Sequence, residues 1–204
     1  MTTPPRSGEA LTYITLVSLV AYAAIATDLY LPAIPYMIMD LGGTTSDGQL
    51  TLSVFMLGLA LGQLVFGPLS DRFGRIPVVR AGTLLFLVTS ILCALANDMG
   101  FMWAMRGLQG MAAASGPVIA RAIVRDRYEG NRAAQVMSTL SAAMAIIPMV
   151  APSIGALILD FADWPAVFIA LAVFAGLVLV ALSRLPETTS NSSGERLTLL
   201  TIIR

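Results

Sequence analysis

Six long apolar stretches, separated by short polar turns, dominate this sequence of 204 residues. A helix needs about 20 apolar residues to cross the hydrocarbon core of a membrane, and each stretch is long enough to do so. The composition agrees, because 57% of the residues are hydrophobic and only 12% are charged. The sequence therefore predicts an all-α membrane protein with transmembrane helices at residues 11–38, 51–70, 77–97, 101–124, 134–159 and 164–184.

The distribution of polar residues predicts three regions. We expect a short N-terminal tail at 1–10, a six-helix bundle at 11–184 and a polar C-terminal tail at 185–204, whose last residues, 196–204, suit the membrane surface. A cleaved signal peptide is the alternative for the N-terminus, because Ala24, Ile25 and Ala26 offer a plausible cleavage spacing. We prefer a first span, since the apolar run continues well past that point.

The arginines indicate the orientation of the bundle. Apart from Arg106, all of them fall in the two tails or at the ends of the spans on the same side, whereas the opposite loops carry only acidic residues: Asp40, Asp47, Asp98, Asp160 and Asp163. An excess of Lys and Arg marks the cytoplasmic side of a membrane protein. We therefore expect both termini to be cytoplasmic.

Several classes of function have little support in the composition. Histidine is absent, which removes the commonest metal ligand and every Ser/His or Cys/His pair, and no nucleophile stands beside a base. The formal net charge is zero, so no basic excess is available to hold nucleic acid. We expect neither an enzyme nor a nucleic-acid-binding protein, and no metal or cofactor.

Asp28 and Arg106 are charged residues inside predicted spans. A charge at the centre of a bilayer costs about 2.5–3.5 kcal/mol on insertion scales, and such residues usually face a cavity or a partner. Counted along the helices, their depths differ by about 6 Å, which an arginine side chain can bridge. One interpretation is a structural ion pair. The other, which we favour, is a carboxylate that binds and releases a proton near Arg106 and a cargo.

Helix-breaking residues follow both charges. They are Pro32 and Pro35 in the first span and Gly107, Gly110, Gly116 and Pro117 in the fourth. The first and fourth spans open two successive triplets, so this correspondence predicts two inverted three-helix repeats with a site between them. Gly58 and Gly62 have the spacing that permits close helix contact.

The connection between the second and third spans is charged and rich in glycine. It runs from Gly67 to Arg75 and contains Asp71, which topology alone does not explain. A carboxylate there can pair with arginine, and such pairs can break and re-form when helices move. A second charged loop on the same side, at 121–132, contains Asp126 and Glu129 and offers partners.

Four motifs together resemble the N-terminal half of the major facilitator superfamily, and within it the drug:proton antiporters of the bicyclomycin and chloramphenicol resistance (Bcr/CflA) family. The matching segments are Gly67 to Arg75, with a departure at Ile76 where a basic residue is usual; Arg106 to Gly110; Ala151 to Ala156, where alanine replaces two glycines; and Asp28 to Pro35.

This resemblance implies proton-coupled efflux of small amphipathic drugs, such as bicyclomycin and chloramphenicol or florfenicol, across the inner membrane. It implies proton coupling by Asp28 and Arg106, and substrate binding by Asp28, Tyr30 and Gln109. The implied conformational switch comprises Gly67, Asp71, Arg72, Gly74, Arg75 and Asp126, and the implied antiporter motif of the fifth span comprises Pro148, Pro152 and Gly155.

The family has twelve spans, so the chain is expected to work with a second six-helix half, in a longer chain or as another copy. The alternative is a truncated or non-transporting membrane subunit that retains the motifs.

Overall fold

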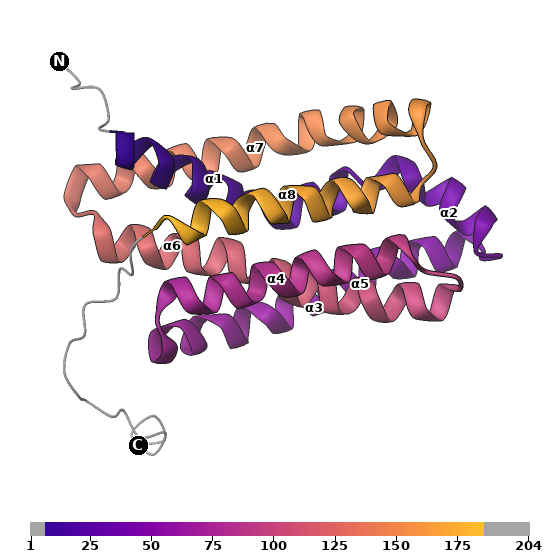
Figure 1. The fold of residues 1–204 in the computed structure, drawn as a ribbon, viewed down its shortest axis with the longest axis horizontal. Coiled ribbons are helices and arrows are strands. Elements are labelled where there is room, and N and C mark those ends of the chain that lie inside the picture. The colour runs from indigo at the N-terminus through magenta and orange to yellow at the C-terminus, as the bar shows by residue number, and fades with distance from the viewer. Residues whose placement is uncertain (1–6, 186–204) are drawn as a thin grey trace.

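The computed structural model describes residues 7–185, with side chains from residue 11 onward, and the predicted surface segment at 196–204 lies outside them. The described residues form an all-helical bundle without strands (Figure 1). Its elements are α1 (Ser7–Asp28), the 3-10 turn η1 (Leu31–Ala33), α2 (Ile34–Asp40), α3 (Thr45–Phe73), α4 (Arg75–Ala94), α5 (Met99–Ala113), α6 (Ser115–Arg127), α7 (Gly130–Phe161) and α8 (Pro165–Ser183).

Five stretches within the described residues are long and apolar enough to cross a membrane: Leu11–Asp40, Thr45–Phe73, Arg75–Ala94, Gly130–Phe161 and Pro165–Ser183. The predicted fourth span is not one continuous helix, because it is divided at Ala114 into α5 of 15 residues and α6 of 13. Pro117 has no N–H to donate to the carbonyl of Ala113, where α5 ends. Ala114 keeps right-handed helical dihedral angles, so α6 continues from α5 after the break.

The first span is also interrupted, at the predicted place. Helix α1 ends at Asp28, and the chain passes through η1 before α2 begins at Ile34. Pro32 cannot donate to the carbonyl of Asp28, nor can Pro35 donate to that of Leu31, which explains why the helix stops here. The first segment of each three-helix triplet is therefore broken.

The predicted loop between the second and third spans is shorter than expected. Helix α3 continues through Pro68 to Phe73, and α4 starts at Arg75, so Gly74 alone lies between the two helices. Its φ of 95° lies in a region that other residues rarely adopt. Most of the motif thus forms about the last two turns of α3 rather than a loop.

The two ends of the bundle differ in charge. Figure 1 shows the start of α1, the α3–α4 and α6–α7 connections and the end of α8 together at one end, where the described arginines other than Arg106 gather. The acidic loops lie at the other end with both tryptophans: Trp164 Nε1 donates to Asp40 Oδ2 at 2.9 Å and Trp103 Nε1 to the carbonyl of Asp47 at 3.1 Å. Tryptophan favours the membrane–water interface.

Glycines allow α3 and α5 to pack closely. A side chain at Gly58 would collide with the carbonyl of Gly107, and one at Gly110 with the carbonyl of Phe55. Close backbone approach is a common basis of helix association in membranes, where the lipid removes most of the hydrophobic driving force. The prediction from Gly58 and Gly62 is confirmed, since Gly62 likewise faces the backbone of Met111.

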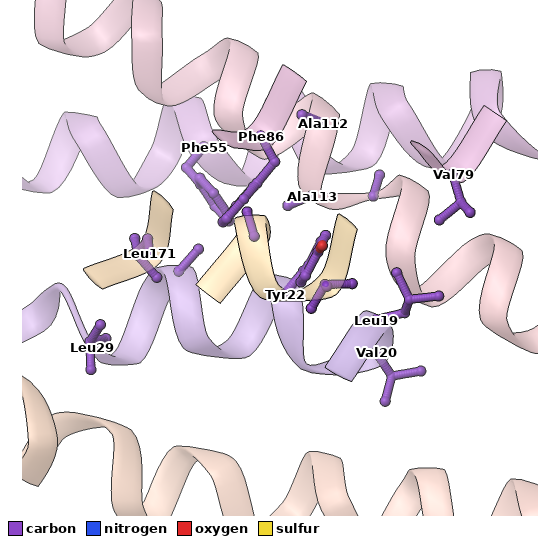
Figure 2. Close-up of a cluster of buried hydrophobic side chains, with 14 of the residues drawn as sticks. Leu19, Val20, Tyr22, Leu29, Phe55, Val79, Phe86, Ala112, Ala113 and Leu171 are labelled. Atoms are coloured by element: carbon purple, nitrogen blue, oxygen red, sulfur yellow. The ribbon is translucent and has the colours of Figure 1, made fainter. Parts of the chain in front are cut away.

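The buried core draws side chains from each of the helices α1 to α8, and Figure 2 shows the part of it around Tyr22 of α1. The ring of Tyr22 stacks on Phe86 of α4, with 4.9 Å between centroids, and meets the edge of Phe174 of α8 at 5.5 Å. These contacts hold α1 against α4 and α8.

Candidate functional site

Arg106 of α5 is fully buried, with none of its surface exposed. Its Nη1 donates to Gln109 Oε1 at 2.6 Å and to the carbonyl of Ala26 in α1 at 3.2 Å. Its Nε and Nη2 are buried without a hydrogen-bond partner. An unsatisfied buried donor costs about 1–3 kcal/mol, and more when it is charged, so this arrangement is not explained by stability alone.

Aromatic rings surround the guanidinium. Its Cζ lies 4.4 Å from the centroid of the Tyr30 ring, 4.3 Å from that of Phe55 and 5.8 Å from that of Phe168. A cation over the face of a ring gains about 2 kcal/mol or more when both are shielded from water. The sequence analysis did not find Phe55 or Phe168, because a phenylalanine in an apolar span gives no signal.

Polar side chains extend this cluster on both sides. Gln109 Nε2 donates to Ser90 Oγ of α4 at 2.8 Å, and the hydroxyl groups of Tyr30 and Thr51 are 2.8 Å apart. Gln109 and Tyr30 were predicted to contact substrate, but both are fully buried beside Arg106. Ser90 and Thr51 were missed, although a polar residue in an apolar span could have drawn attention to them.

Asp28 lies at the end of α1 and is half-buried, with its Oδ1 3.4 Å from the hydroxyl of Thr27. Among the side chains that the structure describes, no ion pair joins Asp28 to Arg106. The structural ion pair considered from the sequence is therefore absent. Arg106 instead reaches the carbonyl of Ala26, two residues before Asp28 in the same helix.

Gly155 brings the predicted antiporter motif of α7 to the break in α1. A side chain at Gly155 would collide with the carbonyl of Leu29, the residue after Asp28. Pro152 is half-buried and Pro148 is exposed. Gly155 is thus the member of this motif that directly contacts the backbone beside Asp28.

The residues of the predicted switch meet at the arginine-rich end of the bundle. Arg75 pairs with Asp71, its Nε donates to Asp126 Oδ2 of α6 at 2.8 Å, and its Nη1 donates to Ser70 Oγ at 2.7 Å. Gly67 joins this group through its carbonyl, which accepts from Ser70 Oγ at 2.9 Å. Arg72 lies instead over the ring of Phe73, with its Cζ 5.1 Å from the ring centroid. The predicted contact between the motif and Asp126 is confirmed, and it ties α3 and α4 to α6.

A cavity of about 410 Å³ lies at the acidic end, between α2 and the α7–α8 connection. Its lining includes Tyr36, Asp40, Asp163 and Trp164, and none of the site residues predicted from the sequence. The cluster around Arg106 and this cavity are therefore separate features.

Comparison with known proteins agrees with the motifs. The family model described as Major Facilitator Superfamily matches residues 15–202. A chloramphenicol resistance protein of Pseudomonas aeruginosa is 40% identical over 162 residues, which cover 79% of this chain and 38% of that protein. A bicyclomycin resistance protein homolog of Haemophilus influenzae is 35% identical over 163 residues, 79% of this chain and 41% of that protein.

The fold has a solved counterpart in the human organic anion transporter MFSD10, with a TM-score of 0.69 at 19% identity over 91% of this chain and 49% of that one. At this identity the likeness concerns the fold alone. The chain spans 38–41% of the length of the two bacterial relatives. The all-helical bundle with broken first segments has the fold of one half of such a protein, and the chain belongs to the major facilitator superfamily.

Proposed function

We propose that this chain is half of a twelve-span antiporter that exports small amphipathic drugs, of the chloramphenicol and bicyclomycin classes, in exchange for protons across the inner membrane. Both termini would lie in the cytoplasm, because the positive-inside rule favours that side for the arginine-rich end of the bundle. The resistance proteins named among its relatives support the substrate class.

One observation carries the proton coupling: Arg106 is fully buried, yet two of its nitrogens have no partner. Its third nitrogen bonds to the carbonyl of Ala26, two residues before Asp28. In the proposed cycle, a movement at the break after α1 brings the carboxylate of Asp28 to these donors. The guanidinium can therefore hold the ionised carboxylate in one state and release it in another.

The proposed exchange of drug for proton depends on the ionised and protonated forms of the Asp28 carboxyl group. Ionised Asp28 accepts hydrogen bonds from Arg106 or from a drug; protonated Asp28 loses most of that attraction. Binding of a proton would release the drug, and loss of the proton would prepare the site for the next drug. Tyr30 and Gln109 would support this exchange by holding Arg106, with substrate contact expected only in a state that uncovers them.

The contacts of Arg75 suggest how movement at the opposite end could accompany this step. Arg75 joins the α3–α4 junction to Asp126 at the end of α6. If two helical blocks rock, this pair can separate and re-form without a large net cost, because each partner is partly hydrated when released. Gly74 supplies the one-residue hinge between α3 and α4.

The experiment compares drug accumulation in cells that lack their own exporters and express the protein from its native locus, so that any second half is present. Wild-type protein should lower intracellular chloramphenicol, and Asp28→Asn should abolish this effect. Asp160→Asn is the matched control, because Asp160 is an exposed carboxylate at the acidic end. Export by Asp28→Asn at the wild-type rate would refute the assignment.

A non-transporting membrane subunit is the second candidate, since the chain covers only 38–41% of its relatives' length. Under this candidate, cells with the wild-type protein, cells with Asp28→Asn and cells without the protein would all accumulate the same amount of drug. The same experiment therefore separates the two.

A further inference from the structure

A charge buried as deeply as Arg106 needs a compensating group. Buried charges in proteins are normally paired with an opposite charge, because desolvation is costly. Among the described side chains, no carboxylate pairs with Arg106. The amide oxygen of Gln109 and the carbonyl of Ala26 both bond to the same nitrogen, which leaves the rest of the guanidinium against aromatic rings.

The rings come from three separate parts of the chain. Tyr30 lies in the break after α1, Phe55 in α3 and Phe168 in α8, and all three are fully buried. The faces of Tyr30 and Phe55 are nearest to the guanidinium, at 4.4 and 4.3 Å from its Cζ. Each ring face carries a partial negative charge, so the three together present a negative surface to the cation.

We propose that Tyr30, Phe55 and Phe168 form an aromatic cage that takes the place of an acidic counter-ion for Arg106. The cage would keep Arg106 charged within the membrane in the state in which Asp28 is released from it. Asp28 would thereby remain available for a proton or a cargo. This last consequence rests on the proposed function, whereas the cage itself does not.

The rings are held in place by contacts of their own. The hydroxyl of Tyr30 bonds to Thr51, and its ring lies 5.3 Å from that of Phe168. The ring of Trp164 is perpendicular to that of Phe168, with 6.1 Å between the centroids, and Gly110 packs on the backbone of Phe55. Rings fixed in this way cannot turn to follow the cation, so they act as positioning residues for Arg106.

Fluorination tests the cage, because fluorine withdraws electrons from the face of a ring while changing its shape little. The 204-residue chain is purified in detergent with Phe55 replaced by phenylalanine, 4-fluorophenylalanine or 3,4,5-trifluorophenylalanine, and its thermal unfolding is followed. The control series replaces Phe66, a buried ring on the same helix with no described cation over it. We expect the melting temperature to fall stepwise with fluorine at position 55 and to stay level at position 66.

The series is repeated with Arg106→Met, which keeps an apolar stem and removes the charge. The stepwise fall at position 55 should then disappear, whereas a purely structural role for Phe55 would leave both series alike. A level series at position 55 with Arg106 present, or an equal fall at position 66, would overturn the cage. Because unfolding is measured without transport, a failure of the cage is distinguishable from a failure of drug export.

Discussion

At the scale of single residues, Arg106 is held by groups that carry no full negative charge. Gln109 is the central one, because it accepts from Arg106 and donates to Ser90 with the same amide group. An amide can do both, whereas a carboxylate could only accept. Glutamine at this position therefore holds the arginine in place without supplying an acidic counter-ion.

Replacing Gln109 by leucine should destabilise the protein clearly. The substitution removes a hydrogen bond to a charged group, which contributes about 1.5–3 kcal/mol. Of the two hydrogen-bond acceptors described for Arg106, the carbonyl of Ala26 then remains. Thermal unfolding in detergent measures the effect. Gln63→Leu is the control, since Gln63 is exposed on α3 and should change the melting temperature little. Equal effects of the two substitutions would contradict this view of Gln109.

At the scale of helices, glycines and prolines perform different tasks. The sequence analysis grouped Gly107 and Gly110 with Pro117 as breakers of the fourth span. The structure shows an unbroken α5 through both glycines, with the break at Ala114. Only proline lacks the N–H that the helix needs, whereas Gly110 allows the close contact between α5 and α3.

Two glycine-to-alanine substitutions should therefore differ. At Gly58 the added methyl group meets the carbonyl of Gly107, and overpacking of this kind costs about 1–3 kcal/mol. At Gly176, inside α8, it meets only Leu87 at ordinary contact distance, so the better helix propensity of alanine should raise stability by about 0.5–1 kcal/mol. Melting temperatures of the two variants in detergent check this, and a similar loss in both would show that the contact between α3 and α5 is looser than described.

The sequence anticipated much of the fold for physical reasons that can be named. Membrane thickness fixes the length of apolar runs, and the prolines after Asp28 mark a break that the structure contains. The ends of helices were less predictable: α3 reaches Phe73 because Pro68 is tolerated inside it. In the site, the charges of Arg106, Arg75 and Asp126 were visible, but the rings around Arg106 were not.

At the scale of the whole molecule, two segments stand out for their exposed apolar surface. Only 11% of the most apolar window of α7 and 28% of that of α3 are buried within the bundle. Lipid can cover part of this surface. A second six-helix half, required by our proposal, would cover another part.

The assembled protein should therefore have at least about twice the 21.5 kDa mass of this chain. The protein is released from its own membrane and captured with an antibody to the N-terminal residues. Native mass spectrometry of the captured protein then gives this mass directly. Both a longer chain and a pair of copies satisfy the expectation. A species of 21.5 kDa alone would contradict the proposed twelve-span assembly.

Proton movement in membrane vesicles tests the central claim most directly. Inside-out vesicles from cells expressing the protein from its native locus are acidified by respiration, and the internal pH is followed with a fluorescent dye. Adding chloramphenicol should release protons with wild-type protein and with Asp160→Asn, but not with Asp28→Asn. Equal proton release by wild-type protein and Asp28→Asn, or none by wild-type protein, would contradict drug–proton exchange through Asp28.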